Sequence, residues 1–233
     1  MWQGEGFFTL LSGLERVGEY KLSKKTNEPL EQENLEEEQV SEIEEELQEL
    51  VEDPANVIFE NGKGFVASED ADRLSQQGFY GTRIDGNKLE LEPVELLHLI
   101  ERKRAIASTP SGELVGSDYI VNSLLEEDPD LWIRYLVFRD LRSRGYAVRK
   151  GFGSGIGFRV YARGDKPGDA NAKELVYVLK EGVPISLSDL DLVTKTAAGS
   201  RKDLVFALVD QNGEVNFYKV AQSTLRDRSG DGQ

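Results

Sequence analysis

The sequence predicts an α/β protein, α+β overall, with a small mixed N-terminal α+β domain followed by a larger mixed sheet flanked by helices. Strand-like apolar runs alternate with helical patterns over residues 118–224. Shorter strands and helices occupy residues 54–108, and residues 109–117, which contain Pro, Gly and Ser, are expected to form a linker. The remainder is an acidic extension over residues 1–53 and a tail over residues 225–233.

The acidic extension holds most of the net charge. The chain has 43 acidic and 28 basic side chains, a formal charge of −15. Between Glu31 and Asp53 there are 12 acidic residues and no Lys or Arg. Apolar residues at helical spacing predict an amphipathic helix over residues 34–52. Its acidic face is interpreted as a solvated surface, with a docking strip for a basic partner or an electrostatic mimic of RNA as the alternatives.

In the N-terminal domain, Asn61-Gly62 lies between two apolar runs and predicts a β-hairpin. A helix is expected next, capped by Ser68 and reaching Leu74. Pro93 opens a second helix, which extends to about residue 104. His98 lies on that helix among leucines and isoleucine, a setting more typical of a structural histidine than of a catalytic one.

The C-terminal domain alternates helices and strands. Helices are expected over residues 118–125 and 129–144, and Gly145 provides the stop signal of the second. A further helix is expected over residues 188–198, with Ser188 as its cap. The strand-like runs are residues 146–148, 158–161, 175–179, 204–209 and 215–220.

Composition excludes several kinds of chemistry. The chain has no Cys and one His, which rules out disulfides, cysteine metal sites and mechanisms that need two imidazoles. The glycine-rich segment 151–157 precedes a strand, whereas a phosphate-binding loop leads into a helix. Glu101-Arg102-Lys103 lies on an expected helix, not on the strand that a metal-dependent nuclease requires. We expect no metal, no cofactor, no membrane span, and a cytoplasmic location.

One segment has the opposite charge. Residues 131–164 hold eight basic residues against the single acid Asp140. The overall charge of −15 would disfavour a nucleic-acid partner, but the local excess of Lys and Arg is typical of a surface that binds phosphates.

Three blocks carry a resemblance: Tyr135 to Tyr146, Phe158-Arg159-Val160-Tyr161, and Ser200 to Asp210. In order and spacing they resemble the nuclease domain of archaeal tRNA-splicing endonucleases, also called tRNA-intron lyases. Residues 57–104 are similar to the small N-terminal domain of that family. The resemblance implies a restriction-endonuclease-like sheet and cleavage of precursor tRNA at a bulge-helix-bulge. It also implies a reaction without metal that leaves 2′,3′-cyclic phosphate and 5′-OH ends.

The resemblance implies three catalytic roles: a Tyr as general base, a His as general acid and a Lys that stabilises the charged phosphorane. Lys202 matches the Lys. We expect the Tyr at Ser154 and the His at Asn171, so neither residue type is kept. A serine hydroxyl does not replace a phenol, and an asparagine amide does not deliver a proton at neutral pH. Two catalytic roles therefore look vacant.

The resemblance also implies RNA and partner contacts. Lys195 stands where the family has an Arg that is thought to stack on a flipped base. The other cations expected to contact RNA phosphates are Arg149, Lys150, Arg159 and Arg201. Asp210 and Glu214 match an acidic turn that inserts into a neighbouring subunit, and Val215 and Phe217 begin the strand that packs against a partner.

Three functional hypotheses follow. The first is a structural, non-catalytic subunit of a heteromeric tRNA-splicing endonuclease, a tetramer by resemblance, paired with a subunit that supplies Tyr, His and Lys. The second is an active endonuclease in which other residues fill the Tyr and His roles. The third is an acidic adaptor that binds RNA or protein without cleaving RNA.

Overall fold

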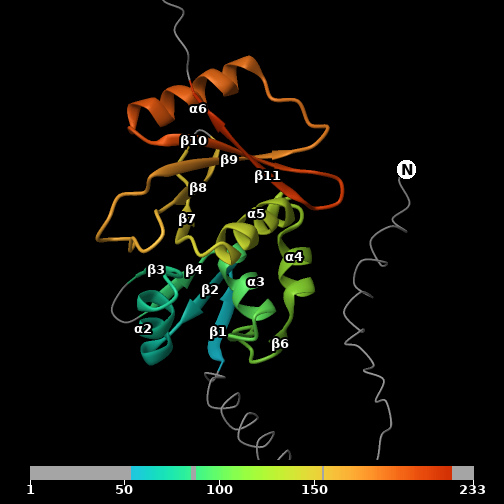
Figure 1. The fold of residues 1–233 in the computed structure, drawn as a ribbon. Helices are drawn as coiled ribbons and strands as arrows, with labels where there is room; N and C mark the ends of the chain where they lie inside the picture. The colour runs from blue at the N-terminus through green and yellow to red at the C-terminus, as the bar shows by residue number, and fades with distance from the viewer. Residues whose placement is uncertain (1–53, 85–87, 154, 222–233) are drawn as a thin grey trace, which may run out of the picture. The chain divides into compact units, whose positions relative to one another are not determined.

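The computed structural model describes residues 54–84, 88–153 and 155–221 (Figure 1). The predicted fold class is confirmed, because the described part contains five helices and two mixed sheets. The acidic extension with its expected helix, the turn at residues 85–87 and the tail lie outside the described residues. No described helix combines the length and apolar character needed to cross a membrane.

The N-terminal sheet consists of β1 (Ala55–Glu60), β2 (Lys63–Val66), β3 (Thr82–Arg83), β4 (Leu89–Leu91), β5 (Ala105–Ser108) and β6 (Leu114–Val115). Its spatial order is β3-β4-β2-β1-β5-β6. The hairpin predicted at Asn61-Gly62 is confirmed: both residues have positive φ, 49° and 73°, and Glu60 pairs with Lys63. This two-residue turn matches the right-handed twist of the strands that it joins.

The helices of this domain begin slightly differently from the prediction. α2 (Ser68–Gln76) starts at Ser68, but its N-cap is Ala67 and no side chain caps it. α3 (Pro93–Glu101) begins at Pro93 as predicted, and Glu92 forms a capping box with Glu95. α3 ends at Glu101 rather than near residue 104, because the chain turns there into β5.

The segment expected as a linker, residues 109–117, contains β6. Val115 of β6 pairs with Ala107 of β5, so this segment closes a hairpin on the N-terminal sheet. α4 (Ser117–Leu124) follows directly and packs against α3. The chain therefore passes between its two sheets through structured elements, not through an extended connection.

The C-terminal sheet consists of β7 (Val148–Lys150), β8 (Ile156–Val160), β9 (Glu174–Lys180), β10 (Asp203–Val209) and β11 (Val215–Val220), in the order β11-β10-β9-β8-β7. β9 and β10 are parallel and joined by α6 (Leu187–Gly199), and the other neighbours are antiparallel. The cap of α6 is Ser186, whose Oγ accepts a hydrogen bond from Asp189 N, so the predicted cap Ser188 was wrong by two residues.

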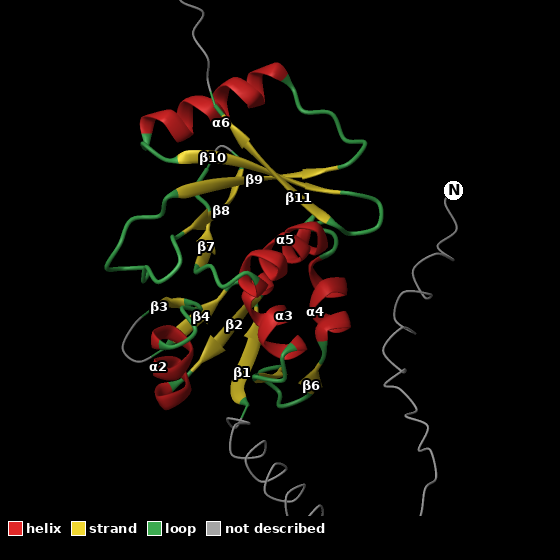
Figure 2. Ribbon diagram, viewed as in Figure 1, coloured by secondary structure: helices red, strands yellow, loops and turns green. Residues whose placement is uncertain are grey.

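Helices cover both faces of this sheet (Figure 2). α5 (Leu131–Ser143) lies on one face, and Gly145, with φ of 83°, follows its end as predicted. α6 lies on the other face, where Val193 and Ala197 pack against Leu175 and Leu204. The opposite side of α5 packs against α3, which joins the two domains in one core.

Aromatic and polar side chains fix this junction. His98 is 4% exposed, its Nδ1 lies 2.9 Å from the Tyr80 hydroxyl, and its ring stands edge-to-face with Phe138. Burial lowers the pKa of His98 to about 4, so the imidazole is neutral at physiological pH. The guanidinium of Arg142 stacks on the Tyr80 ring at 4.4 Å. His98 is therefore a structural residue, in agreement with its setting in the sequence.

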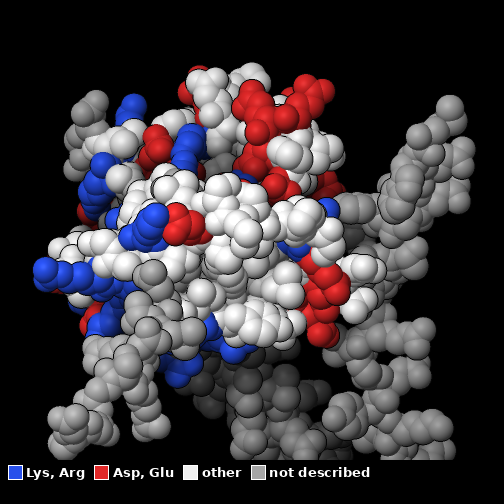
Figure 3. All heavy atoms as spheres, turned by 90° about the horizontal axis from the view of Figure 1, so that it is seen from above, with Lys and Arg blue, Asp and Glu red and all other residues white. Residues whose placement is uncertain are grey.

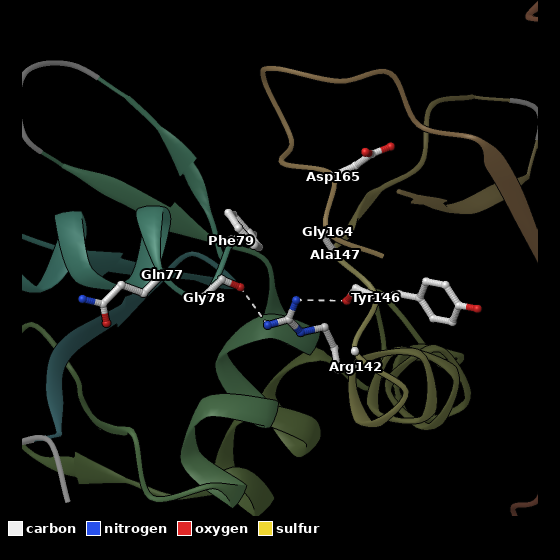
Figure 4. Close-up of a pocket in the computed structure, with 9 residues that line it drawn as sticks. Gln77, Gly78, Phe79, Arg142, Tyr146, Ala147, Gly164 and Asp165 are labelled. Carbon is white, nitrogen blue, oxygen red and sulfur yellow. Dashed lines mark hydrogen bonds between the residues drawn. The ribbon is translucent and has the colours of Figure 1, made fainter. Parts of the chain in front are cut away.

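Arg142 also bridges the domains through its hydrogen bonds (Figure 4). It donates to Gly78 O at 2.7 Å and to Tyr146 O at 3.1 Å, which are carbonyls on opposite sides of the junction. A cavity of about 200 Å³ adjoins these contacts, with Phe79 and Asp165 in its lining. A planar guanidinium suits this place because it can donate in two directions while it stacks on a ring.

Candidate active site

The end of α6 places Lys202 at the start of β10. The chain leaves the helix through Arg201, whose φ of 54° lies in the left-handed region. Arg201 N donates to Ala198 O and Lys202 N donates to Ala197 O, both at 3.1 Å. This is a Schellman cap, in which glycine is the usual left-handed residue. The cap delivers Lys202 directly to the end of the sheet and holds Arg201 beside it in a costly backbone conformation.

Arg201→Gly is expected to stabilise the fold. Glycine adopts a positive φ without steric cost, so the free energy of unfolding should rise by up to about 1 kcal/mol. Urea unfolding measures the effect. Arg201→Lys, which keeps the strain and the charge, is the control; a less stable glycine variant would contradict the strain argument.

Strand pairing brings the end of β8 next to Lys202. Val160 lies opposite Glu174, and Glu174 lies opposite Asp203, so the three residues form one row across the sheet. Tyr161 follows Val160 and Lys202 precedes Asp203, so both lie at the same edge. Because neighbouring strands are about 4.8 Å apart, the Cα atoms of Tyr161 and Lys202 are roughly 10 Å from each other.

The side chains of Tyr161 and Lys202 have different surroundings. Tyr161 lies one residue beyond β8, and its ring packs against Ala147, Ala172 and Phe79 on the side of Arg149 and the domain junction. Lys202 is half-buried, and its Nζ donates to Ser200 O at 3.3 Å. The edge thus offers an ammonium group that has no carboxylate partner among the described residues.

Sequence reasoning missed Tyr161. Its side chain is 6% exposed and packs against Ala147, Ala172 and Phe79. Its hydroxyl makes no hydrogen bond to another residue in the described part of the chain. Its buried ring lies beside Arg149, so it belongs to the packing of the domain junction.

Asn171 lies close to this edge in the chain. It is exposed on the loop between β8 and β9. Two residues later, Lys173 N donates to Val160 O at 2.9 Å, which ties the end of the loop to the row next to Lys202. An amide is thus the side chain that this loop offers at the position where the family resemblance expects a proton donor.

Ser154, the position at which the Tyr was expected, lies outside the described residues. Ile156, two residues later, pairs with Tyr177. Val160, at the opposite end of β8, is the residue that pairs with Glu174 beside Lys202. The strand register therefore brings the end of β8, rather than its start, to the lysine edge.

Arg149, one of the cations expected to contact RNA, belongs to the domain junction. Its guanidinium donates to the carbonyl of Gly81 and lies 3.6 Å from a carboxylate oxygen of the buried Glu95. Burial raises the pKa of Glu95 and lowers that of Arg149, because both groups lose contact with water. Arg149 is therefore occupied in joining β7 to the N-terminal domain.

The other cations that were expected to contact RNA differ in whether their side chains already have a partner in the structure. Lys150 Nζ lies 3.2 Å from a carboxylate oxygen of Glu92, and Arg159 Nε donates to Lys150 O at 2.9 Å. Lys195 pairs at 2.7 Å with an aspartate one turn earlier on α6. Arg201 is exposed and makes no ion pair with a described residue. Of this expected set, Arg201 is the cation that is both free and next to Lys202.

The acidic turn has an internal role. Oδ1 of Asp210 accepts hydrogen bonds from Asn212 N at 2.9 Å and from Glu214 N at 2.8 Å. Asp210 therefore shapes the turn, whereas Glu214 is exposed and makes no ion pair with a described residue. Val215 and Phe217, expected to contact a partner, are half-buried against the core of their own chain.

Charge is divided between the two ends of the C-terminal sheet. In Figure 3 basic side chains gather at the left of the molecule, and a group of acidic side chains lies on the opposite side. The exposed or half-buried cations at the Lys202 end are Arg163, Lys166, Lys173, Arg201 and Lys202. The exposed or half-buried acids at the other end are Glu181, Asp189, Asp191, Asp210 and Glu214. An anionic ligand is attracted to the first end and repelled from the second.

These features place the protein among α/β proteins that carry a cationic site at one end of a mixed sheet. Comparison with known sequences identifies the family. Residues 131–217 match the catalytic C-terminal domain of tRNA intron endonucleases, and residues 56–120 match the N-terminal domain of the same enzymes. The chain therefore belongs to the tRNA intron endonuclease family.

Individual relatives agree with this assignment. A tRNA-splicing endonuclease of Methanothermobacter thermautotrophicus is 35% identical over 66% of this chain and 88% of its own length. Another, of Thermococcus gammatolerans, is 36% identical over 63% of this chain and 84% of its own. A third, of Methanococcoides burtonii, is 34% identical over 64% of this chain but only 41% of its own length.

Proposed function

We propose that the chain is a subunit of a tRNA-splicing endonuclease that can hold the scissile phosphate but lacks two catalytic groups. Asn171 carries this proposal, because an amide stands where the family resemblance implies the proton donor. Ser154 stands where it implies the phenol, and Tyr161, at the other end of β8, is buried. Lys202 supports the phosphate contact, because its ammonium group lies at the end of the sheet without a carboxylate partner among the described residues.

The proposed reaction is a transesterification on precursor tRNA at a bulge-helix-bulge. O2′ attacks phosphorus while its proton passes to water, because Ser154 is not a phenol and Tyr161 is buried, and Lys202 stabilises the charge on the non-bridging oxygens. The P–O5′ bond breaks, which leaves a 2′,3′-cyclic phosphate, and O5′ must gain a proton to become the 5′-OH end. Asn171 has no acidic proton to give, so this last step is unassisted in the isolated chain.

A partner subunit with the complete Tyr, His and Lys set would supply the efficient active site of a hetero-oligomer. The turn with Glu214 supports a partner contact, because this carboxylate is exposed and available to a basic cleft. β11 is the last strand of its sheet, so the backbone groups on its outer side are available for pairing. The family resemblance implies that four such domains assemble.

Reconstitution tests this proposal. The chain alone is expected to cut a bulge-helix-bulge RNA slowly, and addition of a family subunit that carries all three catalytic residues should raise the rate by about 10²-fold or more. Gel analysis of product ends and size-exclusion chromatography of the mixture are the measurements. Lys202→Ala in this chain should leave the fast rate unchanged if the partner performs the chemistry.

Lys202, which has no carboxylate partner among the described residues, also fits a second candidate, an active endonuclease in which other residues fill the Tyr and His roles. Fast cleavage by the isolated chain that Lys202→Ala abolishes would select this candidate over the structural subunit. Failure of the mixture to form a complex or to cut would instead remove the tRNA-splicing role itself.

A further inference from the structure

The described Lys and Arg side chains of this protein divide into those with an acidic partner and those without one. Ten of them lie within 4 Å of a carboxylate oxygen: Lys63, Arg73, Arg83, Arg134, Arg139, Arg144, Arg149, Lys150, Lys195 and Lys219. A cation in such a pair must break it before it can bind a phosphate, so its contribution to RNA affinity is reduced. The cations without a carboxylate partner are therefore the better candidates for RNA contact.

Five cations without an ion pair to a described residue occur at the Lys202 end of the sheet, and one of them, Arg163, stacks on the Tyr146 ring at 5.2 Å. Lys166 and Lys173 are exposed on the loop between β8 and β9, and neither makes an ion pair with a described residue. Arg201 and Lys202 lie at the end of α6 and are equally free of carboxylate partners there. We call these four residues the basic strip.

Two backbone bonds tie the loop to the site. Lys173 N donates to Val160 O at 2.9 Å, and Asp203 N donates to Lys173 O at 3.0 Å. Lys173 is therefore held by backbone hydrogen bonds between the ends of β8 and β10. It immediately precedes Glu174, which pairs with Asp203, so it lies next to Lys202. In Figure 1 this loop and the C-terminal end of α6 both lie at the left of the sheet.

The acids near the strip are fewer than its cations. Asp203 is engaged by Lys219 at 2.8 Å. Asp165, Asp169 and Glu174 form no ion pair with a described residue and lower the local positive charge. The four cations of the strip, together with Arg163, outnumber these three acids, so this end attracts an anion.

We infer that the basic strip binds consecutive phosphates of an RNA strand, with Lys166 and Lys173 extending the contact beyond the phosphate at Lys202. This inference rests on the proposed function and deepens it, because it gives the path of the RNA backbone across the loop between β8 and β9. It also transfers the main RNA contacts from Arg149, Lys150 and Lys195, which are paired, to lysines on that loop. The ligand is recognised by its phosphates, so sequence preference is not expected.

The test is fluorescence anisotropy of the full chain with a labelled bulge-helix-bulge RNA at several salt concentrations. The double variant Lys166→Ala/Lys173→Ala should bind about tenfold more weakly at 150 mM salt, and its slope of log affinity against log salt should fall by about two. The matched control is Lys103→Ala/Lys180→Ala, which removes the same charge from exposed lysines that also lack an ion pair within the described residues. Lys173→Arg should keep wild-type binding.

Equal weakening by the strip variant and the control would overturn the inference, since it would reduce the effect to net charge. Wild-type affinity in the strip variant would overturn it as well. The cleavage assay separates this inference from the proposed function: selective loss of binding without any cleavage by the reconstituted mixture would keep the strip and remove the splicing role. Cleavage by the mixture together with unaltered RNA binding in the strip variant would keep the splicing role and remove the basic strip as an RNA contact.

Discussion

Asn171→His is expected to raise the rate at which the isolated chain cleaves a bulge-helix-bulge RNA by about 10²-fold or more. The substitution places an imidazole on the loop beside the edge that holds Tyr161 and Lys202. An imidazolium can protonate the departing O5′, which the wild-type amide cannot do. Single-turnover cleavage without added partner measures the gain, and the products should end in 2′,3′-cyclic phosphate and 5′-OH.

A pH profile identifies the new group as a proton donor. The rate of the histidine variant should fall as the pH rises above the ordinary imidazole pKa of about 6.5, because the acid form is then lost. Asn171→Gln, which keeps an amide, should remain as slow as the wild type. Lys202→Ala in the histidine background should remove the gain. An Asn171→His variant no faster than wild type would contradict the assignment of this position to the missing acid.

Phe138→Ala is expected to lower the free energy of unfolding by about 3–5 kcal/mol. Phe138 is 1% exposed at the place where α5 meets the N-terminal domain. Its ring centroid lies 5.6 Å from that of His98 and 5.9 Å from that of Phe158. Truncation leaves a cavity that borders both domains, and the loss is a large part of the 5–15 kcal/mol that a typical domain possesses. Urea unfolding followed by circular dichroism gives the value.

Phe152→Ala is the matched control for this prediction. Phe152 is 42% exposed, so its truncation should change the free energy of unfolding by less than about 0.5 kcal/mol. If Phe138→Ala cost no more than Phe152→Ala, the junction between α3 and α5 would not be the shared core that the contacts indicate. The unfolding transition should also stay single, because both domains share this core.

Much of the fold follows from local sequence signals. Asn61-Gly62 predicts the first hairpin because few residue pairs accept two positive φ angles, and Pro93 marks the start of α3 because it lacks the N–H that a helix start leaves unpaired. The cap of α6 was placed at Ser188 rather than Ser186, since several serines there offer the same side-chain acceptor. The pairing of Val115 with Ala107 was also missed, because such a short strand has no periodicity of its own.

The candidate site was only partly predictable. Lys202 was found from its motif, and Asn171 from its place in the family resemblance. The row of Val160, Glu174 and Asp203 beside Lys202 was not predictable, because it depends on the register of β8, β9 and β10, which no local pattern encodes. The charge of Arg149 was visible in the sequence, but its burial beside Glu95 was not.

The sequence by itself determined the class of fold, the lysine and the amide at two positions of the expected site, and the separation of acidic from basic segments. Tertiary structure decided which strand ends meet at Lys202 and which described cations are free to bind an anion. The physical reason is that helices, turns and net charge depend on neighbours in the chain. Strand register and ion pairing instead depend on residues far apart, such as Lys150 and Glu92, which meet only when the two domains pack.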